Sequence, residues 1–361
     1  MSEPPLMAII RRRIGETGPI TLADYMGLAL GHPDHGYYVK ARPIGREGDF
    51  VTAPEVSQMF GELIGAWALD LWQRSIAPAP LVLAEAGPGR GTLMADMIRT
   101  ARLLPDAARS LTVHLVETNR TLRAEQERRL ADLAPVTWHD NPATLPDAPM
   151  ILIANEFLDA LPIRQFVRKA GHWHEVMVTV AEDSLGFTTS PLPADPKLIP
   201  ASLRDAPEGT VAEIAPAAER AVADIADRIA RLDGAALFID YGHAGHAVGD
   251  TFQAVSGHAF ADPLARPGEV DLTAHVDFAA VAEAARTAGA ATHGPVTQGA
   301  FLAALGLHQR ATILKRNGAP GIEEAVHRLA DRAEMGDLFK VLAITAPDAD
   351  PPAGFAATET P

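Results

Sequence analysis

The chain has 361 residues, of which 47% are hydrophobic, and this length and composition suit a globular protein with one large or two ordinary domains. Its 46 Asp and Glu residues outnumber its 31 Lys and Arg residues, so a net charge of −15 disfavours nucleic acid and favours cationic partners. The absence of cysteine excludes disulfides and thiolate metal ligands. Because no apolar run reaches about 18 residues and the first residues lack the layout of a signal peptide, we expect a cytoplasmic protein without a membrane span.

Residues 1–60 predict an N-terminal helical and lid segment. Apolar periodicity favours helices over 6–16 and 22–30, and a stretch rich in Gly, Pro and Asp follows them. We interpret this stretch as an ordered loop over a site, because it carries several aromatic residues, namely Tyr37, Tyr38 and Phe50. A helix over 55–73 comes next, with one broad apolar face.

Strands and helices alternate along most of the remaining chain, which predicts an α/β fold with a doubly wound, mostly parallel sheet. The expected strands are 82–84, 111–116, 136–138, 150–154, 235–241 and 339–345, and the expected helices are 92–102, 121–133, 215–231, 277–288, 298–305 and 322–334. The pattern changes over 165–231, where short alternating runs precede an Ala-rich helix and predict an inserted β-hairpin and helix region. We therefore expect a core made of 61–164 and 232–347, and a disordered tail over 348–361.

The segment from Leu81 to Thr92 predicts a nucleotide-type site at the end of the first core strand. An apolar run leads to an acid and to glycines at every second position, the residues concerned being Glu85, Gly87, Pro88, Gly89 and Gly91. A dinucleotide loop has different glycine spacing and serves a pyrophosphate. This spacing resembles the S-adenosylmethionine loop of class I methyltransferases, whose ligand carries a sulfonium cation and an amino acid end. An ordinary strand-to-helix turn is the alternative.

Two acids after the next strands are candidates for the rest of the nucleoside. Glu117 ends the strand 111–116, where a carboxylate is able to accept both ribose hydroxyls, although it could instead serve the following helix. Asp140 follows the strand 136–138 and is a candidate for the adenine amino group. We expect the neighbouring Trp138 to be either part of this site or simply part of the core.

A second group of polar residues follows the apolar strand 150–154. Asn155, Glu156 and Asp159 offer carboxamide and carboxylate oxygens at the carboxyl edge of the sheet, where open α/β folds build their sites. An acidic rim suits a cationic substrate, and carboxylates could orient a guanidinium and receive the proton that it loses during methyl transfer. Glu55 could reach the same pocket from the lid. A helix-capping turn is the alternative for Asn155 and Asp159.

No metal site is expected. The histidines include pairs such as His172 and His174, which lie in the predicted hairpin without acids at ligand spacing, so we interpret them as surface residues. A serine nucleophile also lacks its motif.

Five separated motifs together resemble the MidA-like methyltransferases, over nearly the whole chain. They are 48–57, 85–93, 155–162, 240–243 and 271–278. The resemblance implies S-adenosyl-L-methionine bound at the glycine loop, Glu117 and Asn155, with Glu156 and Asp159 beside the transferred methyl group. It implies a lid formed by Asp49, Phe50, Thr52, Pro54 and Glu55, and a far wall of the cleft that includes Tyr241 and His275.

The same resemblance implies a function, because the family includes a mitochondrial assembly factor of respiratory complex I. We expect a protein arginine methyltransferase that forms symmetric dimethylarginine on the quinone-site subunit of NADH:quinone oxidoreductase. This chain lacks the transit segment of mitochondrial members, which leaves its compartment and substrate open. The alternatives are a small-molecule N- or O-methyltransferase, a non-enzymatic assembly chaperone, and, least favoured, a nicotinamide oxidoreductase. The oligomeric state is unknown.

Overall fold

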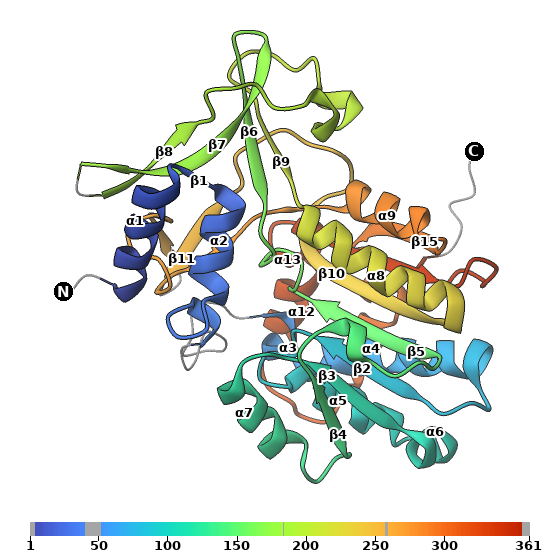
Figure 1. The fold of residues 1–361 in the computed structure, drawn as a ribbon. Coiled ribbons are helices and arrows are strands. Elements are labelled where there is room, and N and C mark those ends of the chain that lie inside the picture. The colour runs from blue at the N-terminus through green and yellow to red at the C-terminus, as the bar shows by residue number, and fades with distance from the viewer. Residues whose placement is uncertain (1–3, 40–51, 183, 257–258, 356–361) are drawn as a thin grey trace.

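The computed structural model describes residues 4–39, 52–182, 184–256 and 259–355. Figure 1 shows a layered α/β core below a smaller accessory part that contains the N-terminal helices. The lid residues Asp49 and Phe50 lie outside the described residues. None of the described helices is long and apolar enough to cross a membrane.

A mainly parallel sheet forms the centre of the core, in the order β15-β16-β10-β5-β2-β3-β4 among the described residues. Its strands β10, β5, β2, β3 and β4 are parallel, whereas β16 runs antiparallel to β10 and β15 runs antiparallel to β16. A short strand, β14, pairs with the end of β10. Uninterrupted apolar runs form the middle strands because helices cover both faces of the sheet. The bounds are β2 Val82–Ala86, β3 Thr112–Val116, β4 Val136–His139, β5 Met150–Asn155, β10 Gly234–His243, β14 Val276–Asp277, β15 Ala291–Thr297 and β16 Phe339–Thr345.

Helices cover both faces of this sheet (Figure 1). One face packs against α3 Ala53–Val56, α4 Gln58–Leu71, α5 Thr92–Ala101, α10 Gln298–Ala304, α11 Leu307–Arg316, α12 Ile322–Ala330 and α13 Met335–Leu338. The other face packs against α8 Pro216–Leu232 and α9 Phe278–Thr287. The helices α6 Pro105–Ser110 and α7 Arg120–Leu130 precede β3 and β4. The structure therefore joins α8 to the core, whereas the sequence pattern assigned it to the insertion.

The accessory part combines segments that are far apart in the sequence. A β-sheet of order β1-β7-β6-β9, with β8 beside β7, includes both the inserted hairpin and the N-terminal strand β1. Apolar residues of β1, β7 and β8 share one cluster with α1, α2 and a three-stranded sheet, β12-β11-β13, whereas Phe166, Trp173 and Ala212 belong to a second, smaller cluster. The bounds are α1 Pro5–Thr17, β1 Ile20–Thr21, α2 Leu22–Gly31, β6 Arg164–Lys169, β7 His172–Ala181, β8 Ser184–Thr189, β9 Val211–Ile214, β11 Gln253–Ser256, β12 Ala259–Ala261 and β13 Asp271–Thr273.

Two local differences from the sequence pattern have clear causes. The predicted helix 55–73 is divided because Ser57 is extended and caps α4, its Oγ accepting a hydrogen bond from the Met59 amide at 3.2 Å. The expected tail is ordered through Phe355, which is buried against Phe301, while the Trp67 indole donates to the Ala353 carbonyl. Apolar burial therefore extends the core beyond β16; residues 356–361 lie outside the described part of the chain.

Candidate active site

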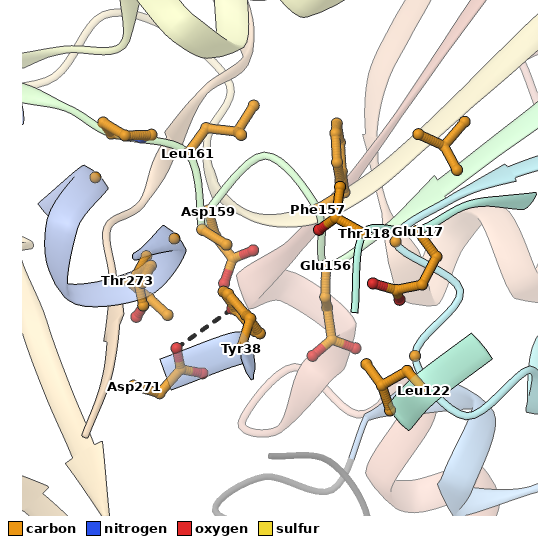
Figure 2. A pocket seen from close by; sticks show the side chains of 18 of the residues that line it. Tyr38, Glu117, Thr118, Leu122, Glu156, Phe157, Asp159, Leu161, Asp271 and Thr273 are labelled. Carbon is orange, nitrogen blue, oxygen red and sulfur yellow. Dashed lines mark hydrogen bonds between the residues drawn. The ribbon is translucent and has the colours of Figure 1, made fainter. Parts of the chain in front are cut away.

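A cavity of about 420 Å³ opens at the carboxyl ends of β2, β3 and β5, where open α/β folds bind ligands. Figure 2 shows two sides to it. We call the side lined by Glu117, Thr118 and Leu122 the donor lobe, and the side lined by Tyr38, Asp159, Asp271 and Thr273 the acceptor lobe. Glu156 and Phe157 lie between the two lobes.

A smaller cavity of about 50 Å³ adjoins the first one. The two cavities share Thr52, Gly87, Gly89 and Glu156. The smaller cavity is also lined by other residues that the sequence analysis assigned to the site, namely Pro54, Glu55, Glu85, Pro88 and Asn155. The structure thus brings the lid, the glycine loop and the polar group after β5 to one place.

The glycine loop adopts a backbone that side chains disfavour. Gly87, Gly89 and Gly91 have φ values of +67°, +49° and +76°. A Cβ atom on Gly87 would lie 3.1 Å from Cδ2 of Phe157, which is tighter than an ordinary contact. These glycines let the chain turn from β2 into α5 and leave the space above the loop open to a ligand.

Glu85 is buried with an unmatched oxygen. Its side chain is 3% exposed, and burial raises its pKa to about 8. Its Oε2 has no hydrogen-bond partner among the described residues, and the same is true of Oδ1 of Asn155, which lines the same small cavity. Two buried acceptors without donors fit a ligand that brings an ammonium group, such as the amino acid end of S-adenosyl-L-methionine.

Glu117 is held in place at the end of β3. Its Oε1 accepts from the Asn119 amide at 2.7 Å, and its Oε2 accepts from Nε2 of Gln126 at 3.3 Å. A carboxylate has about four lone-pair sites, so the ribose hydroxyls could still be accepted. Burial raises the pKa of Glu117.

Gln126 is a site residue that the sequence analysis missed. It is fully buried on α7 and donates to the Gly89 carbonyl at 2.7 Å as well as to Glu117. Its own oxygen accepts from the Trp138 indole at 2.8 Å. Trp138 therefore packs on the core and also supports the donor lobe. No motif marks Gln126 in the sequence. The one signal that could have identified it is an amide side chain on the helix that follows Glu117, next to the glycine loop.

Asp140 lies at the cavity wall with its carboxylate largely exposed. The side chain is 79% exposed, and Oδ1 accepts from Nη2 of Arg123 at 2.6 Å. The adenine contact therefore stays a prediction, and it would require this exposed ion pair to share its carboxylate with the ligand.

The polar group after β5 is compact. Nδ2 of Asn155 donates to Oε1 of Glu156 at 3.0 Å, and the Ala53 amide donates to the same oxygen at 3.3 Å. Glu156 has φ +50°, which is unusual for a residue with a side chain. Burial, and next the charge of Asp159, raise the pKa of Glu156 to about 7.

Asp159 is anchored by Tyr241 and by the backbone. The Tyr241 hydroxyl donates to Oδ2 at 2.6 Å, whereas Oδ1 is buried without a partner among the described residues. Burial raises the pKa of Asp159 to about 6. Behind this residue, Oδ2 of Asp240 accepts from the amides of Leu158 and Asp159 at 2.9 and 3.2 Å. Asp240 therefore shapes the loop, a role that its motif did not reveal.

The remaining predicted residues divide into two groups. Thr52, Pro54 and Glu55 line the cavities, and Oε1 of Glu55 accepts from the Thr92 hydroxyl at 2.5 Å. His275 does not line either cavity; its ring packs edge-on against Tyr241, with centroids 5.5 Å apart. His275 instead lines a separate cavity, together with its chain neighbours Ala274, Val276 and Asp277. In the described ranges, no three His, Asp or Glu side chains gather as a metal-binding group.

Comparison with known proteins identifies the chemistry of this site. Residues 63–296 match the model of the family described as "Putative S-adenosyl-L-methionine-dependent methyltransferase". The chain belongs to this methyltransferase family. It has a class I methyltransferase fold, and S-adenosyl-L-methionine is its methyl donor. Both expectations from the sequence are thereby confirmed.

Curated relatives cover most of the chain. It is 35% identical to the mitochondrial protein arginine methyltransferase NDUFAF7 homolog of Drosophila melanogaster, over 93% of this chain and 83% of that protein. It is 34% identical to the mitochondrial protein arginine methyltransferase NDUFAF7 of Mus musculus, over 94% of this chain and 84% of that protein. These names place the relatives in mitochondria and give no support to the cytoplasmic location that we expected.

A solved structure shows the same fold with a ligand. A Burkholderia thailandensis protein crystallised with S-adenosyl-homocysteine has a TM-score of 0.85 and 30% identity, covering 97% of this chain and 94% of that one. S-adenosyl-homocysteine is the donor after loss of its methyl group. The buried acceptors at Glu85 and Asn155 and the glycine loop fit such a ligand in this chain.

Proposed function

We propose that this methyltransferase modifies arginine side chains of a protein and forms symmetric dimethylarginine. Its relatives carry the name protein arginine methyltransferase, which supports the proposal. The observation that carries it is the unmatched Oδ1 of Asp159, a buried acceptor at the cavity wall close enough to Glu156 for their charges to interact. A guanidinium supplies both a charge and several N–H donors to such a pair.

The chemistry assigns distinct tasks to the two acids. When bound, S-adenosyl-L-methionine supplies a methyl group that its sulfonium charge activates. The guanidinium nitrogen that takes this methyl group forms a C–N bond as the C–S bond breaks, and it must release one proton. Glu156, with a pKa of about 7, is suited to receive that proton near neutral pH. Asp159, held by Tyr241, is suited to orient the guanidinium.

We further propose that the acceptor is the quinone-site subunit of NADH:quinone oxidoreductase and that methylation aids assembly of this complex. The family resemblance supports this choice, and an acidic cavity agrees with a basic peptide segment. We also propose the cytoplasm as the compartment, which cell fractionation would test against a mitochondrial location.

Transfer of labelled methyl groups tests the main proposal. The purified protein is incubated with methyl-labelled S-adenosyl-L-methionine and peptides from that subunit, each with a version in which lysine replaces arginine. Mass spectrometry should find methyl groups on arginine only, ending in the symmetric dimethyl form. Labelled lysine, or label on a small molecule alone, would contradict the proposal. Glu156→Gln should lower the signal while the matched variant at the exposed Glu182, Glu182→Gln, should not.

A further inference from the structure

The acceptor lobe is built by three segments that are distant in sequence. Tyr38 comes from the 3-10 turn Tyr37–Val39, Asp159 from the loop after β5, and Asp271 from β13. Figure 2 shows Tyr38 between the two carboxylates. The accessory part therefore contributes directly to the wall of the cavity opposite the donor lobe.

Each carboxylate in this lobe is held by a tyrosine hydroxyl. The Tyr241 hydroxyl donates to Oδ2 of Asp159 at 2.6 Å, and the Tyr38 hydroxyl donates to Oδ1 of Asp271 at 3.3 Å. Both aspartates are 7% exposed. Burial raises the pKa of Tyr38 well above its ordinary value, and the charges of Asp271 and Asp159 act in the same direction. The phenol consequently remains a neutral donor, and both acids lie close enough to act on it.

Hydrogen bonds also connect Tyr38 to the donor lobe. The Tyr38 backbone carbonyl accepts a hydrogen bond from Nδ2 of Asn119, the residue that caps α7. The backbone N–H of Asn119 donates to Oε1 of Glu117. The distance between the two lobes is thus set by a direct chain of contacts from Glu117 to Asp271. Such a chain would keep an acceptor group at a constant position relative to the donor.

We propose that Asp271, oriented by Tyr38, is a second anchoring carboxylate for the substrate guanidinium and, with Asp159, determines the specificity of the site for arginine. The inference rests on the proposed arginine methylation. Oδ1 of Asp159 has no hydrogen-bond partner among the described residues, which indicates that a bound substrate supplies an N–H group at the acceptor lobe. This observation does not depend on the acidic character of the cavity. A planar guanidinium offers N–H donors on two edges, so two carboxylates bind it while one nitrogen faces the methyl group. Lysine has one nitrogen, which would have to take the methyl group itself, so it has no second nitrogen left to hold the two carboxylates.

Peptide binding in the presence of saturating S-adenosyl-homocysteine tests the inference by calorimetry. The probes are a short acetylated peptide with one arginine and versions with citrulline or lysine in its place. Asp271→Asn should weaken binding of the arginine peptide by about tenfold to 100-fold, as expected for loss of a charged hydrogen-bond partner. Its affinity for S-adenosyl-homocysteine should stay within about twofold of wild type. The penalty for replacing arginine with citrulline should also shrink in this variant, which a purely structural defect would not produce.

Two further variants make the result decisive. Tyr38→Phe keeps the ring and removes the orienting hydroxyl. It should therefore weaken binding of the arginine peptide, but by less than Asp271→Asn does. Asp34→Asn removes one exposed carboxylate from the same N-terminal segment and should change nothing. If wild type methylates the arginine peptide and Asp271→Asn binds it equally well, the anchoring role is wrong while the proposed function stands. If wild type neither binds nor methylates arginine peptides, the proposed function fails and the inference fails with it.

Discussion

Gln126 donates a hydrogen bond to Glu117, with 3.3 Å between its Nε2 and the Oε2 of the carboxylate, and the same amide nitrogen lies 2.7 Å from the Gly89 carbonyl. One buried side chain thus fixes the glycine loop relative to the acid that we assign to the ribose. These contacts hold the donor lobe together from within the protein.

Replacing Glu117 with alanine should weaken S-adenosyl-homocysteine binding by about 1 to 3 kcal/mol, because hydrogen bonds to a charged group would be lost. Isothermal calorimetry measures the change directly. An unchanged dissociation constant would mean that another group holds the ribose.

Gln126→Leu should preserve side-chain volume but leave the Gly89 carbonyl and the Trp138 indole without their partner. We expect a loss of about 1 to 3 kcal/mol in the free energy of unfolding, together with weaker ligand binding. Urea denaturation and calorimetry provide the two measurements. Gln309→Leu, at an exposed position on α11, is the matched control and should leave both values unchanged. Normal ligand binding by Gln126→Leu would show that the loop keeps its shape without this amide.

Gly89→Val should abolish donor binding. The residue has φ +49° and lines both cavities, so a branched side chain would be strained and would enter the ligand space. Gly209→Val is a matched control, because Gly209 also has a positive φ, +80°, yet a Cβ there would meet no atom within 4 Å. The control should lose some stability and still bind S-adenosyl-homocysteine. Retained binding by Gly89→Val would contradict the placement of the ligand.

Binding of S-adenosyl-homocysteine at pH 7 should release a proton from Glu85. Its pKa of about 8 means that the free protein carries a neutral carboxyl at pH 7, and a ligand ammonium beside it would favour the ionised form.

The raised pKa of Glu85 also means that the ligand-free fold loses stability as pH rises from about 4.5 to 8, since the folded state holds the proton to a higher pH than the unfolded chain does. Calorimetry in buffers of different ionisation enthalpy counts the released protons. Glu85→Gln should show no such release from this site and a flatter dependence of stability on pH; identical proton release would place the ammonium elsewhere.

Glu156→Gln should slow methyl transfer and leave S-adenosyl-homocysteine binding nearly unchanged. The wild-type rate should rise as pH increases through about 7, because the proton acceptor must be ionised and burial raises its pKa to that value. The variant should lose this limb of the pH profile. Single-turnover rates between pH 5.5 and 8.5 would test both statements. Full activity in the variant would remove Glu156 from the reaction.

The residues that we propose for the donor site could be selected from local pattern, because open α/β folds bind ligands at the carboxyl ends of parallel strands. Glu85, Glu117 and Asn155 each follow an apolar run, and strands of one parallel sheet bring such positions together. The alternation of elements predicted the sheet for the same reason. Helix boundaries were less accurate where a cap decided them, as at Ser57.

The sequence by itself determined the alternating fold and the methyl donor, since buried strands, alternating glycines and strand-end acids are local signals. Only the tertiary structure decided that Tyr38 meets Asp271, that Gln126 contacts Gly89 and that His275 packs on Tyr241 without lining the two site cavities. The tertiary structure also decided that the N-terminal segment joins the inserted sheet, through pairing of Ile20 with Val178. These contacts join segments far apart in the chain, and the complementary packing of apolar faces selects them, which no local periodicity records.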